Sequence, residues 1–226
     1  MDEILVRIAR ALACLTRLHI LSRLAREKEL APSELARDLG LAFGTVCEHL
    51  RRLSDAGIIR RRRSGTWCYC VGESPYSKDT VSGKTARWLQ GLLGDPLKAV
   101  KRCGISRLPA ASARISAHKP SRTAWAEAEA RIHQVLFEAL TAFTNVRRLQ
   151  ILRRLATGEA VRVESLMKDL HMSDAAVSRH MDKLLRRGYI QAARQSYYLA
   201  YRLAKEYKSG LHRDLHNIVA SSGSKR

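Results

Sequence analysis

The sequence predicts a mainly helical fold with small β-hairpins, in which one structural unit is built twice within 226 residues. The first observation behind this prediction is a repeat: RLHILSRLA (17–25) and SELARDLGLAFGTVCEHLRRLSDAGIIR (33–60) return as RLQILRRLA (148–156) and ESLMKDLHMSDAAVSRHMDKLLRRGYIQ (164–191). The second is the spacing of apolar residues at three and four positions, which is typical of amphipathic helices. The third is the glycine that follows a helical pattern in each copy, Gly57 and Gly188.

The two copies align without a gap from Arg17 to Val71 of the first copy, and their identities fall mostly at apolar positions. Because apolar side chains form cores, we expect the copies to share a fold and to differ in the chemistry that they turn outward. Identical pairs include Arg17/Arg148, Leu18/Leu149, Ile20/Ile151, Leu21/Leu152, Leu35/Leu166, Val46/Val177, His49/His180, Leu53/Leu184 and Ile59/Ile190.

The composition favours two small domains and a negatively charged partner. A duplicated unit in a chain of this length indicates two domains, and because small domains bury a modest fraction of their surface, we expect the two to share a core. The chain has 41 Lys and Arg residues against 21 Asp and Glu, a formal net charge of +20. This excess is spread over both copies and the stretch between them, which predicts a partner of dense negative charge.

The sequence also indicates a cytoplasmic protein that does not enter a membrane. The start, MDEILVRIARAL, has neither the basic nor the long apolar region of a secretory signal, and no stretch approaches the ~18 uninterrupted apolar residues of a membrane span. The cysteines are odd in number and irregularly spaced, which favours reduced thiols in a cytosol. They are Cys14, Cys47, Cys68, Cys70 and Cys103.

Each copy contains the pattern of a helix-turn-helix. In the first copy, Pro32 marks the first turn of a short helix that ends at Gly40. A second helix is predicted over 44–56, because Val46, Leu50 and Leu53 form one apolar stripe. A tight turn between two such helices, the second of which exposes a polar face, defines the motif.

A β-hairpin is predicted directly after each helix-turn-helix. In the first copy it comprises 59–63, a tip at Ser64 and Gly65, and 66–71; in the second it spans 190–203, with Ser196 in place of the tip glycine, so its turn type is left open. A helix-turn-helix followed by a hairpin is a winged helix.

Further helices flank each unit, and they divide the chain into four parts. Helices are expected over 1–13, 84–93, 124–141 and 204–219, and the third carries a wide apolar stripe from Trp125 to Phe143 that is typical of an interface. The stretch 107–122 (RLPAASARISAHKPSR) has five basic residues and no acid, as expected of a charged linker. The predicted parts are a first domain 1–95, a linker 96–123, a second domain 124–220 and a disordered tail 221–226.

The segments ALACLTRLHILSRLA and LARDLGLAFGTVCEHLRRLSDAGIIRRRRSGTWCY resemble the arsenical-resistance-repressor (ArsR) type of winged helix, and LMKDLHMSDAAVSRHMDKLLRRGYI is similar to the same family. The resemblance covers about two thirds of the chain. Members of the family work as homodimers in which the first and last helices of each subunit pack together and two recognition helices reach successive major grooves. The resemblance therefore implies an intramolecular pseudo-dimer that binds double-stranded DNA, and it leaves open whether pseudo-dimers pair again.

In the second copy, the outward face of the predicted recognition helix has the side chains of a base reader. Arginine can bond a guanine edge bidentately, a serine hydroxyl can bond a base or a phosphate, and alanine methyls can meet thymine methyls. The predicted DNA-binding residues of this copy are Ser173, Ala176, Arg179, Lys183 and, in the wing, Arg194.

In the first copy, base reading is in doubt, because the family that it resembles is polar at the positions of Ala42, Phe43, Gly44 and Cys47. In addition, Glu48 stands where the second copy has Arg179. A carboxylate that faces phosphates is unfavourable unless it accepts from a cytosine amine or pairs with a neighbour on its helix. Four consecutive arginines (60–63) follow in the wing; they alternate between the two sides of a strand, so about half can face one duplex and neutralise its phosphates. The predicted DNA-binding residues of this copy are Thr45, Arg51, Arg52, Arg61 and Arg63.

We expect no cofactor and no resident metal, although two pairs of residues are candidate metal ligands. Cys68 and Cys70 share one face of a strand but lack a third ligand, so ordinary buried or half-buried thiols are favoured. His212 and His216 lie one helical turn apart on a basic helix, where histidines usually face solvent. The sequence has no phosphate-binding loop, nucleophile elbow or paired-carboxylate cleft, so an enzyme is not predicted.

The leading hypothesis is a sequence-specific regulator of transcription, acting as a repressor, that reads an asymmetric DNA site with two unequal recognition helices. The first alternative is a protein-interaction module in which the first copy no longer reads DNA; the apolar start of its recognition helix, including Phe43, motivates it. The second is nonspecific nucleoid or RNA binding, which the net charge alone would allow. The sequence does not identify the operator, the regulated genes or an effector.

Overall fold

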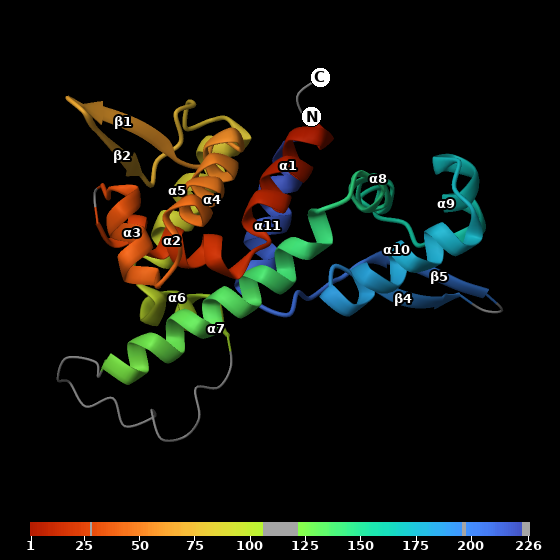
Figure 1. Cartoon of the computed structure of the whole chain (residues 1–226). Helices are drawn as coiled ribbons and strands as arrows, with labels where there is room; N and C mark the ends of the chain where they lie inside the picture. The colour runs from red at the N-terminus through yellow and green to blue at the C-terminus, as the bar shows by residue number, and fades with distance from the viewer. Residues whose placement is uncertain (28, 106–121, 196–197, 223–226) are drawn as a thin grey trace.

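Each copy of the repeat forms three helices followed by an antiparallel hairpin, in a computed structural model that describes residues 1–27, 29–105, 122–195 and 198–222 (Figure 1). Two winged helix-turn-helix units are therefore present, as predicted. The first comprises α2 (Leu15–Arg26), α3 (Pro32–Leu39), α4 (Phe43–Asp55), β1 (Arg60–Ser64) and β2 (Trp67–Val71); the second comprises α8 (Val146–Leu155), α9 (Val163–Leu170), α10 (Asp174–Arg187), β4 (Ile190–Gln195) and β5 (Tyr198–Leu203).

The remaining elements surround these units. They are α1 (Asp2–Leu12), α5 (Val81–Leu93), α6 (Pro96–Arg102), α7 (Arg122–Leu140) with a 3-10 turn η2 (Thr141–Phe143), β3 (Val161–Arg162) and α11 (Gly210–Ser221). None of the helices in the described part of the chain is long and apolar enough to cross a membrane.

Two of the flanking helices begin three or more residues away from the predicted start. Helix α5 starts at Val81 rather than at 84, because the Thr80 hydroxyl caps it by accepting a hydrogen bond from Gly83 N (3.1 Å). Helix α11 starts at Gly210 rather than at 204, because Ala204 N donates to Tyr189 O (2.9 Å) and so continues the pairing next to the hairpin. Residues 204–209 form bends and irregular backbone rather than a helical turn.

The prediction of a linker over 96–123 was wrong for its first residues, which form a helix. Residues 96–102 form α6, which has Pro96 in its first turn and an Asp95 carboxylate that accepts from Lys98 N (3.1 Å). Ala99 and Val100 are buried, and α6 packs against α7. The basic stretch 106–121 and the end of the predicted tail, 223–226, lie outside the described residues.

The turns between the helices follow the predicted glycine chemistry in the first copy and depart from it once in the second. Gly57 and Gly188 have φ of 69° and 75°, and the residues after them close the same cap, with Ile58 N bonded to Leu53 O (3.0 Å). His171 (φ 50°) occupies the left-handed conformation at the position where the first copy has a glycine. Such a conformation costs an ordinary residue roughly 1–2 kcal/mol, so the shared packing of α9 and α10 must hold it.

The two wings have the same register, and each gains an extra pairing that the sequence did not indicate. In the first wing Arg62 lies opposite Tyr69, and Leu30 forms a single bridge to Cys70. In the second wing the corresponding pairing extends to the two-residue strand β3, in which Val161 lies opposite Tyr201. The tip of the second hairpin (196–197) is outside the described residues, so its turn type stays a prediction.

Helix α7 joins the two units through one continuous hydrophobic core. It contacts α6, α2 and α1 of the first half and α11 of the second, and α5 also packs against α11 (Figure 1). Buried side chains from both copies form one cluster, in which Ala128, Ile132, Leu136 and Ala139 of α7 are fully inaccessible to solvent. The two units therefore do not have separate cores.

Polar contacts complete the junction between the halves. The Arg10 guanidinium donates to Thr144 O (2.9 Å), and Arg26 pairs with Glu129 (3.1 Å). Arg153 also forms an ion pair with Asp2.

A buried arginine at the same position of each copy organises the start of the repeat. Arg148 donates to Ala142 O (2.7 Å) and Thr141 O (2.9 Å), and Arg17 donates to the equivalent carbonyls of Ala11 and Arg10. Each guanidinium thus bonds carbonyl groups at the end of the preceding helical segment, where carbonyls lack the usual backbone partner. Thr141 O also accepts from the Thr144 hydroxyl (3.1 Å). The arginine contact explains why an arginine is identical among positions that are otherwise mostly apolar.

Replacing Arg148 with methionine is expected to lower the free energy of unfolding by roughly 2–4 kcal/mol, because buried carbonyls lose charged donors while the apolar stem is retained. Urea unfolding followed by circular dichroism measures this change. The matched control is Arg131→Met on the exposed side of α7, which should change stability by less than about 0.5 kcal/mol. Equal effects of the two substitutions would contradict the anchoring role.

The junction also contains a buried histidine, which predicts a dependence of stability on pH. His133 of α7 is 1% exposed, its Nε2 lies 2.7 Å from Ser22 Oγ of α2, and burial lowers its pKa to about 4. An unfolded histidine titrates near 6.5. Between about pH 6.5 and 4 the unfolded chain therefore binds more protons, and the free energy of unfolding should fall as the pH is lowered through this window.

Urea titrations at several pH values should show this loss, and His133→Gln should reduce its slope. The exposed His171 provides the control, because His171→Asn removes an imidazole that water already surrounds in the folded chain. A stability that is constant from pH 7 to 4.5 would show that burial of His133 does not act in this way.

Candidate nucleic-acid interface

The outward face of α10 presents cationic side chains that acids on the same helix do not neutralise. Arg179 is exposed, and its Nε donates to the carbonyl of Ala175 one turn earlier (3.1 Å). The acid of this face, Asp182, is instead paired with Arg186. Lys183 is half-buried, and its pKa is lowered by burial first and by neighbouring arginines second. The charge of Arg179 is therefore available to an external partner.

The start of α10 is fixed by the capping residue Ser173, which the sequence also predicted as a DNA contact. Ser173 has an extended backbone, and its hydroxyl accepts a hydrogen bond from Ala176 N (3.4 Å). Ser173 is exposed, whereas Ala176 is half-buried. The hydroxyl therefore has a structural task, and its remaining donor capacity faces solvent.

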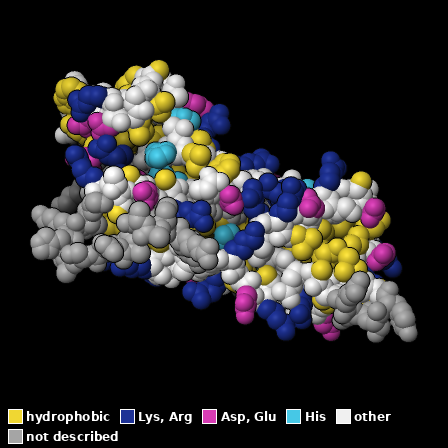
Figure 2. Space-filling model, turned by 90° about the horizontal axis from the view of Figure 1, so that it is seen from below, with side chains coloured by type: hydrophobic (Ala, Val, Ile, Leu, Met, Phe, Trp, Pro, Cys, Tyr) yellow, Lys and Arg dark blue, Asp and Glu magenta, His cyan; other side chains and the backbone are white. Residues whose placement is uncertain are grey.

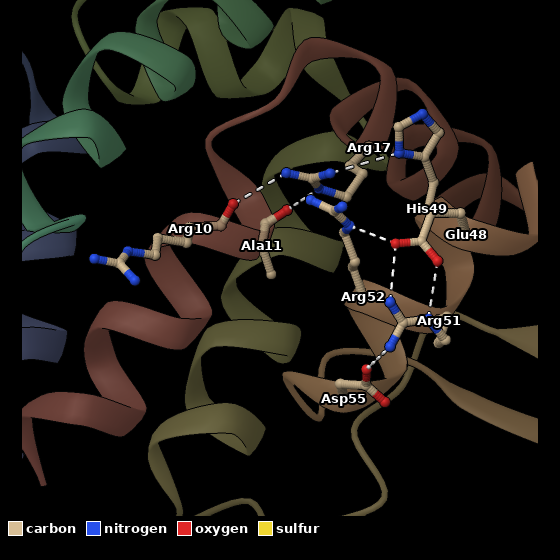
Figure 3. Close-up of polar contacts among 8 residues, drawn as sticks. All are labelled: Arg10, Ala11, Arg17, Glu48, His49, Arg51, Arg52 and Asp55. Carbon is tan, nitrogen blue, oxygen red and sulfur yellow. Dashed lines mark hydrogen bonds and ion pairs between the residues drawn. The ribbon is translucent and has the colours of Figure 1, made fainter. Parts of the chain in front are cut away.

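The equivalent face of α4 is neutralised by its own acids (Figure 3). Glu48 accepts two hydrogen bonds from Arg51 (both 2.9 Å) and one from Arg52 (2.8 Å), while Arg51 also bonds Asp55 (3.1 Å). The hydrogen bonds from Arg51, followed by that from Arg52, lower the pKa of Glu48 to about 2. The charges of two acidic and two basic side chains thus cancel on this face. Thr45 is exposed near the start of the helix.

Glu48 therefore pairs with its helix neighbours, which is one of the two arrangements that would make a carboxylate tolerable near phosphates. The sequence placed Arg51 and Arg52 on the outward face, and the structure does so as well, but it joins both to Glu48. Spacings of three and four residues between acid and base were the signal for this network.

The first wing divides its four arginines into two pairs, as strand alternation predicted. Arg60 lies 3.3 Å from Glu73, and Arg62 lies 2.6 Å from Glu29. Arg61 and Arg63 point to the other side, are exposed, and have no carboxylate partner among the described residues. These two guanidinium groups are free to neutralise phosphates.

The second wing differs from the first in its surface. Tyr198 and Leu199 are 38% and 50% exposed, and the space-filling view shows an apolar patch at this end of the molecule (Figure 2). Arg162 of β3 lies over the Tyr198 ring at 3.3 Å from its centre. The predicted contact residue Arg194 belongs to β4, but its side chain lies outside the described residues.

The two histidines considered as metal ligands do not face solvent as expected, because His212 is buried and His216 is half-buried. His212 is 4% exposed, its Nδ1 lies 2.9 Å from Ser209 Oγ, and burial lowers its pKa to about 4. His216 lies 3.0 Å from the Tyr207 hydroxyl, and both imidazoles pack against the buried Tyr189 ring. An amphipathic α11 that packs on α7 and α5 explains this burial, which the basic character of the helix concealed.

The cysteine pair has the predicted burial, with Cys70 buried and Cys68 half-buried. Burial raises the pKa of the Cys70 thiol to about 11, which disfavours the thiolate that a metal needs. Within the residues that the structure describes, no three His, Cys, Asp or Glu side chains are grouped so that they could hold a metal ion.

The identical histidines of the two copies lie at the edge of the buried stripe, as expected. Nδ1 of His49 is 3.5 Å from the Arg17 guanidinium, next to the Glu48 network (Figure 3). Burial, followed by the nearby arginines, lowers the pKa of both His49 and His180. Their place is thus beside the buried arginine of each copy rather than on the outward face.

Comparison with known proteins gives the same family for both copies. The family model described as "Bacterial regulatory protein, arsR family" matches residues 14–61 and 145–192. The chain is 33% identical over 78 residues to the HTH-type transcriptional regulator KmtR of Mycobacterium tuberculosis, a match that covers 34% of this chain and 59% of KmtR. It is 39% identical over 62 residues to the arsenic resistance transcriptional regulator ArsR1 of Pseudomonas putida, covering 27% and 48%.

The chain thus spans about half the length of these curated relatives. A solved structure, the homodimeric winged helix-turn-helix DNA-binding domain of a possible ArsR-family regulator from Mycobacterium bovis, matches 53% of this chain and 89% of its own at 24% identity and a TM-score of 0.34. The same family model thus matches each half of the chain, and both halves are similar to winged helix-turn-helix regulators of the arsR family.

Proposed function

We propose that the protein is a regulator of transcription that binds double-stranded DNA sequence-specifically. In this proposal the second unit reads bases, and the first unit mainly contacts the phosphate backbone of the DNA. The observation that carries this proposal is the different pairing of the two recognition helices. Arg179 of α10 has no acid partner on its helix, whereas Arg51 and Arg52 of α4 are held by Glu48. A guanidinium must be free to bond a guanine edge bidentately.

The remaining exposed cations support the same division of labour. Arg61 and Arg63 in the first wing can bind phosphates, which adds affinity without sequence information. The net charge of +20 favours association with a polyanion over the whole surface. The target site is accordingly asymmetric, with one half specified by bases and the other by backbone contacts.

We also propose that the two units act as an intramolecular pseudo-dimer and that binding represses transcription. The shared core around α7 and the packing of α5 against α11 support the pseudo-dimer. Every helix and strand that the structure describes belongs to a winged unit or packs against one, so occupation of a site by these units is the simplest mode of action. Occupation of a promoter excludes polymerase.

Arg179→Ala should relax sequence preference, because a bidentate arginine contact contributes about 1–3 kcal/mol of discrimination between bases. The measurement is selection of bound duplexes from a random DNA pool, followed by fluorescence anisotropy on the selected and on scrambled sequences. Arg51→Ala is the matched control on the other recognition helix, and it should leave the selected sequence unchanged. A palindromic selected site, or equal loss of preference in both variants, would refute the division between the units.

The double variant Arg61→Gln/Arg63→Gln should weaken binding to all duplexes alike. It should also reduce the slope of log K against log salt by about 2, because two phosphate contacts no longer release counterions. Arg60→Gln/Arg62→Gln removes the same charge from the opposite side of the strand, where Glu73 and Glu29 are the partners, and should change the slope less. If the two double variants behave identically, only net charge matters and the wing contact is absent.

A protein-binding role for the first unit is the second candidate, and one observation favours it. Phe43, the first residue of α4, is 57% exposed, which is unusual for a large apolar side chain at a position that would approach DNA. The absence of any affinity for duplex DNA at low salt would favour this candidate over the first.

A further inference from the structure

A pocket of about 500 Å³ lies between the ends of four helices, and we call it the end pocket. The start of α1, the end of α4, the start of α5 and the end of α11 surround it. Three of these helices belong to the first half and α11 to the second (Figure 1). The volume is in the range of sites for small organic molecules. A molecule in the end pocket would therefore touch both halves.

Apolar side chains that are partly exposed to solvent line the end pocket. Ile4 is 44% exposed and Tyr76 is 57% exposed, and both line it together with Ile8 and Val81. Exposed large apolar side chains that cluster around one hollow mark binding sites more often than isolated ones. The lining thus suits a ligand with an apolar body.

The apolar wall is held in a fixed shape. The Tyr76 ring packs so closely on Gly57 that a β-carbon at this glycine would collide with it. The Ser82 hydroxyl donates to the carbonyl of Ala56 (3.1 Å), which ties α5 to the end of α4. A preformed wall reduces the entropic cost of binding.

The rim of the end pocket carries spare positive charge. Arg7 and Lys84 line it, and the described residues give neither of them an ion-pair partner. Of the two acids on the rim, Asp55 is already paired with Arg51 (3.1 Å), which leaves Asp79 against the two cations. A ligand with an anionic group is therefore favoured over a cationic one.

We propose that the end pocket binds a small organic anion with an apolar body, such as an aromatic or aliphatic carboxylate or sulfonate. The apolar body lies against Ile4 and Tyr76, and the anionic group lies near Lys84 and Arg7. Because Ser221 and Ser222 at the end of α11 contribute to the lining, the ligand binds only while the two halves keep the arrangement described above. Contact with Asp55 and Ala56 places it at the end of the first recognition helix.

Fluorescence titration of the full chain with 1-anilinonaphthalene-8-sulfonate tests this proposal, because the probe combines an apolar aromatic body with a sulfonate. Saturable binding of one probe per chain is expected. Ile4→Gln should weaken it about tenfold by removing apolar contact. The matched control is Leu15→Gln, because Leu15 is 42% exposed but lies outside the end pocket, and it should bind the probe as the unaltered chain does.

The charge requirement is tested with N-phenyl-1-naphthylamine, which has the same body without the sulfonate. It should bind the unaltered chain roughly threefold to fivefold more weakly than the sulfonate, in keeping with one exposed ion pair. Lys84→Gln should remove this difference, whereas Lys101→Gln, on the exposed side of α6, should preserve it.

Equal probe binding by Ile4→Gln and the unaltered chain, or tighter binding of the neutral probe, would overturn the proposal. Circular dichroism and thermal unfolding of each variant separate loss of the end pocket from loss of the fold. The titration contains no DNA, so its failure and a failure of the proposed function remain distinguishable.

Discussion

The fold depends on a single constraint, which is that α7 must bury apolar residues against elements of both halves. Its fully inaccessible residues, among them Ile132 and Leu136, lie in the same cluster as the cores of both winged units. Small winged units bury too little surface to be very stable alone, so the shared core supplies what each lacks. The contacts of α5 with α11 and of α1 with α7 follow from this arrangement, as does the burial of histidines that a solitary unit would expose.

The outward faces of the two recognition helices differ in where their acidic residues lie, and both faces keep basic residues. Where the second copy has Arg179, the first has Glu48, a carboxylate within reach of two arginines on α4. Both arginines bond this carboxylate although they remain exposed. In the first wing, alternation along the strand separates the arginines held by Glu29 and Glu73 from those left free. Part of the positive charge counted in the sequence is thus neutralised by ion pairs within the molecule.

The sequence was sufficient to predict the repeat, the helix-turn-helix motifs, the hairpins and the glycines that end the recognition helices, because these depend on local spacing and on residues such as Gly57 and Gly188. It was insufficient for α6 and for the start of α11, which depend on tertiary partners: α6 is stabilised by packing on α7, and Ala204 is held by Tyr189. The role of Arg17 and Arg148 was visible only as an unexplained identity, since their acceptors are backbone carbonyls that no sequence pattern marks. The spacing of Glu48, Arg51 and Arg52 allows ion pairs between them. Whether these pairs form depends on the side-chain rotamers, which the sequence does not give.

The continuity of the chain between α6 and α7 has a consequence for behaviour at high dilution. Two separate subunits that bind DNA as a pair fall apart when few copies are present, and their occupancy of a site then depends on the square of their concentration. Here the partner of each unit is attached to it, so its local concentration does not change with the number of molecules. If the two units bind DNA together as proposed, occupancy should therefore follow a simple hyperbolic curve down to a few copies per compartment.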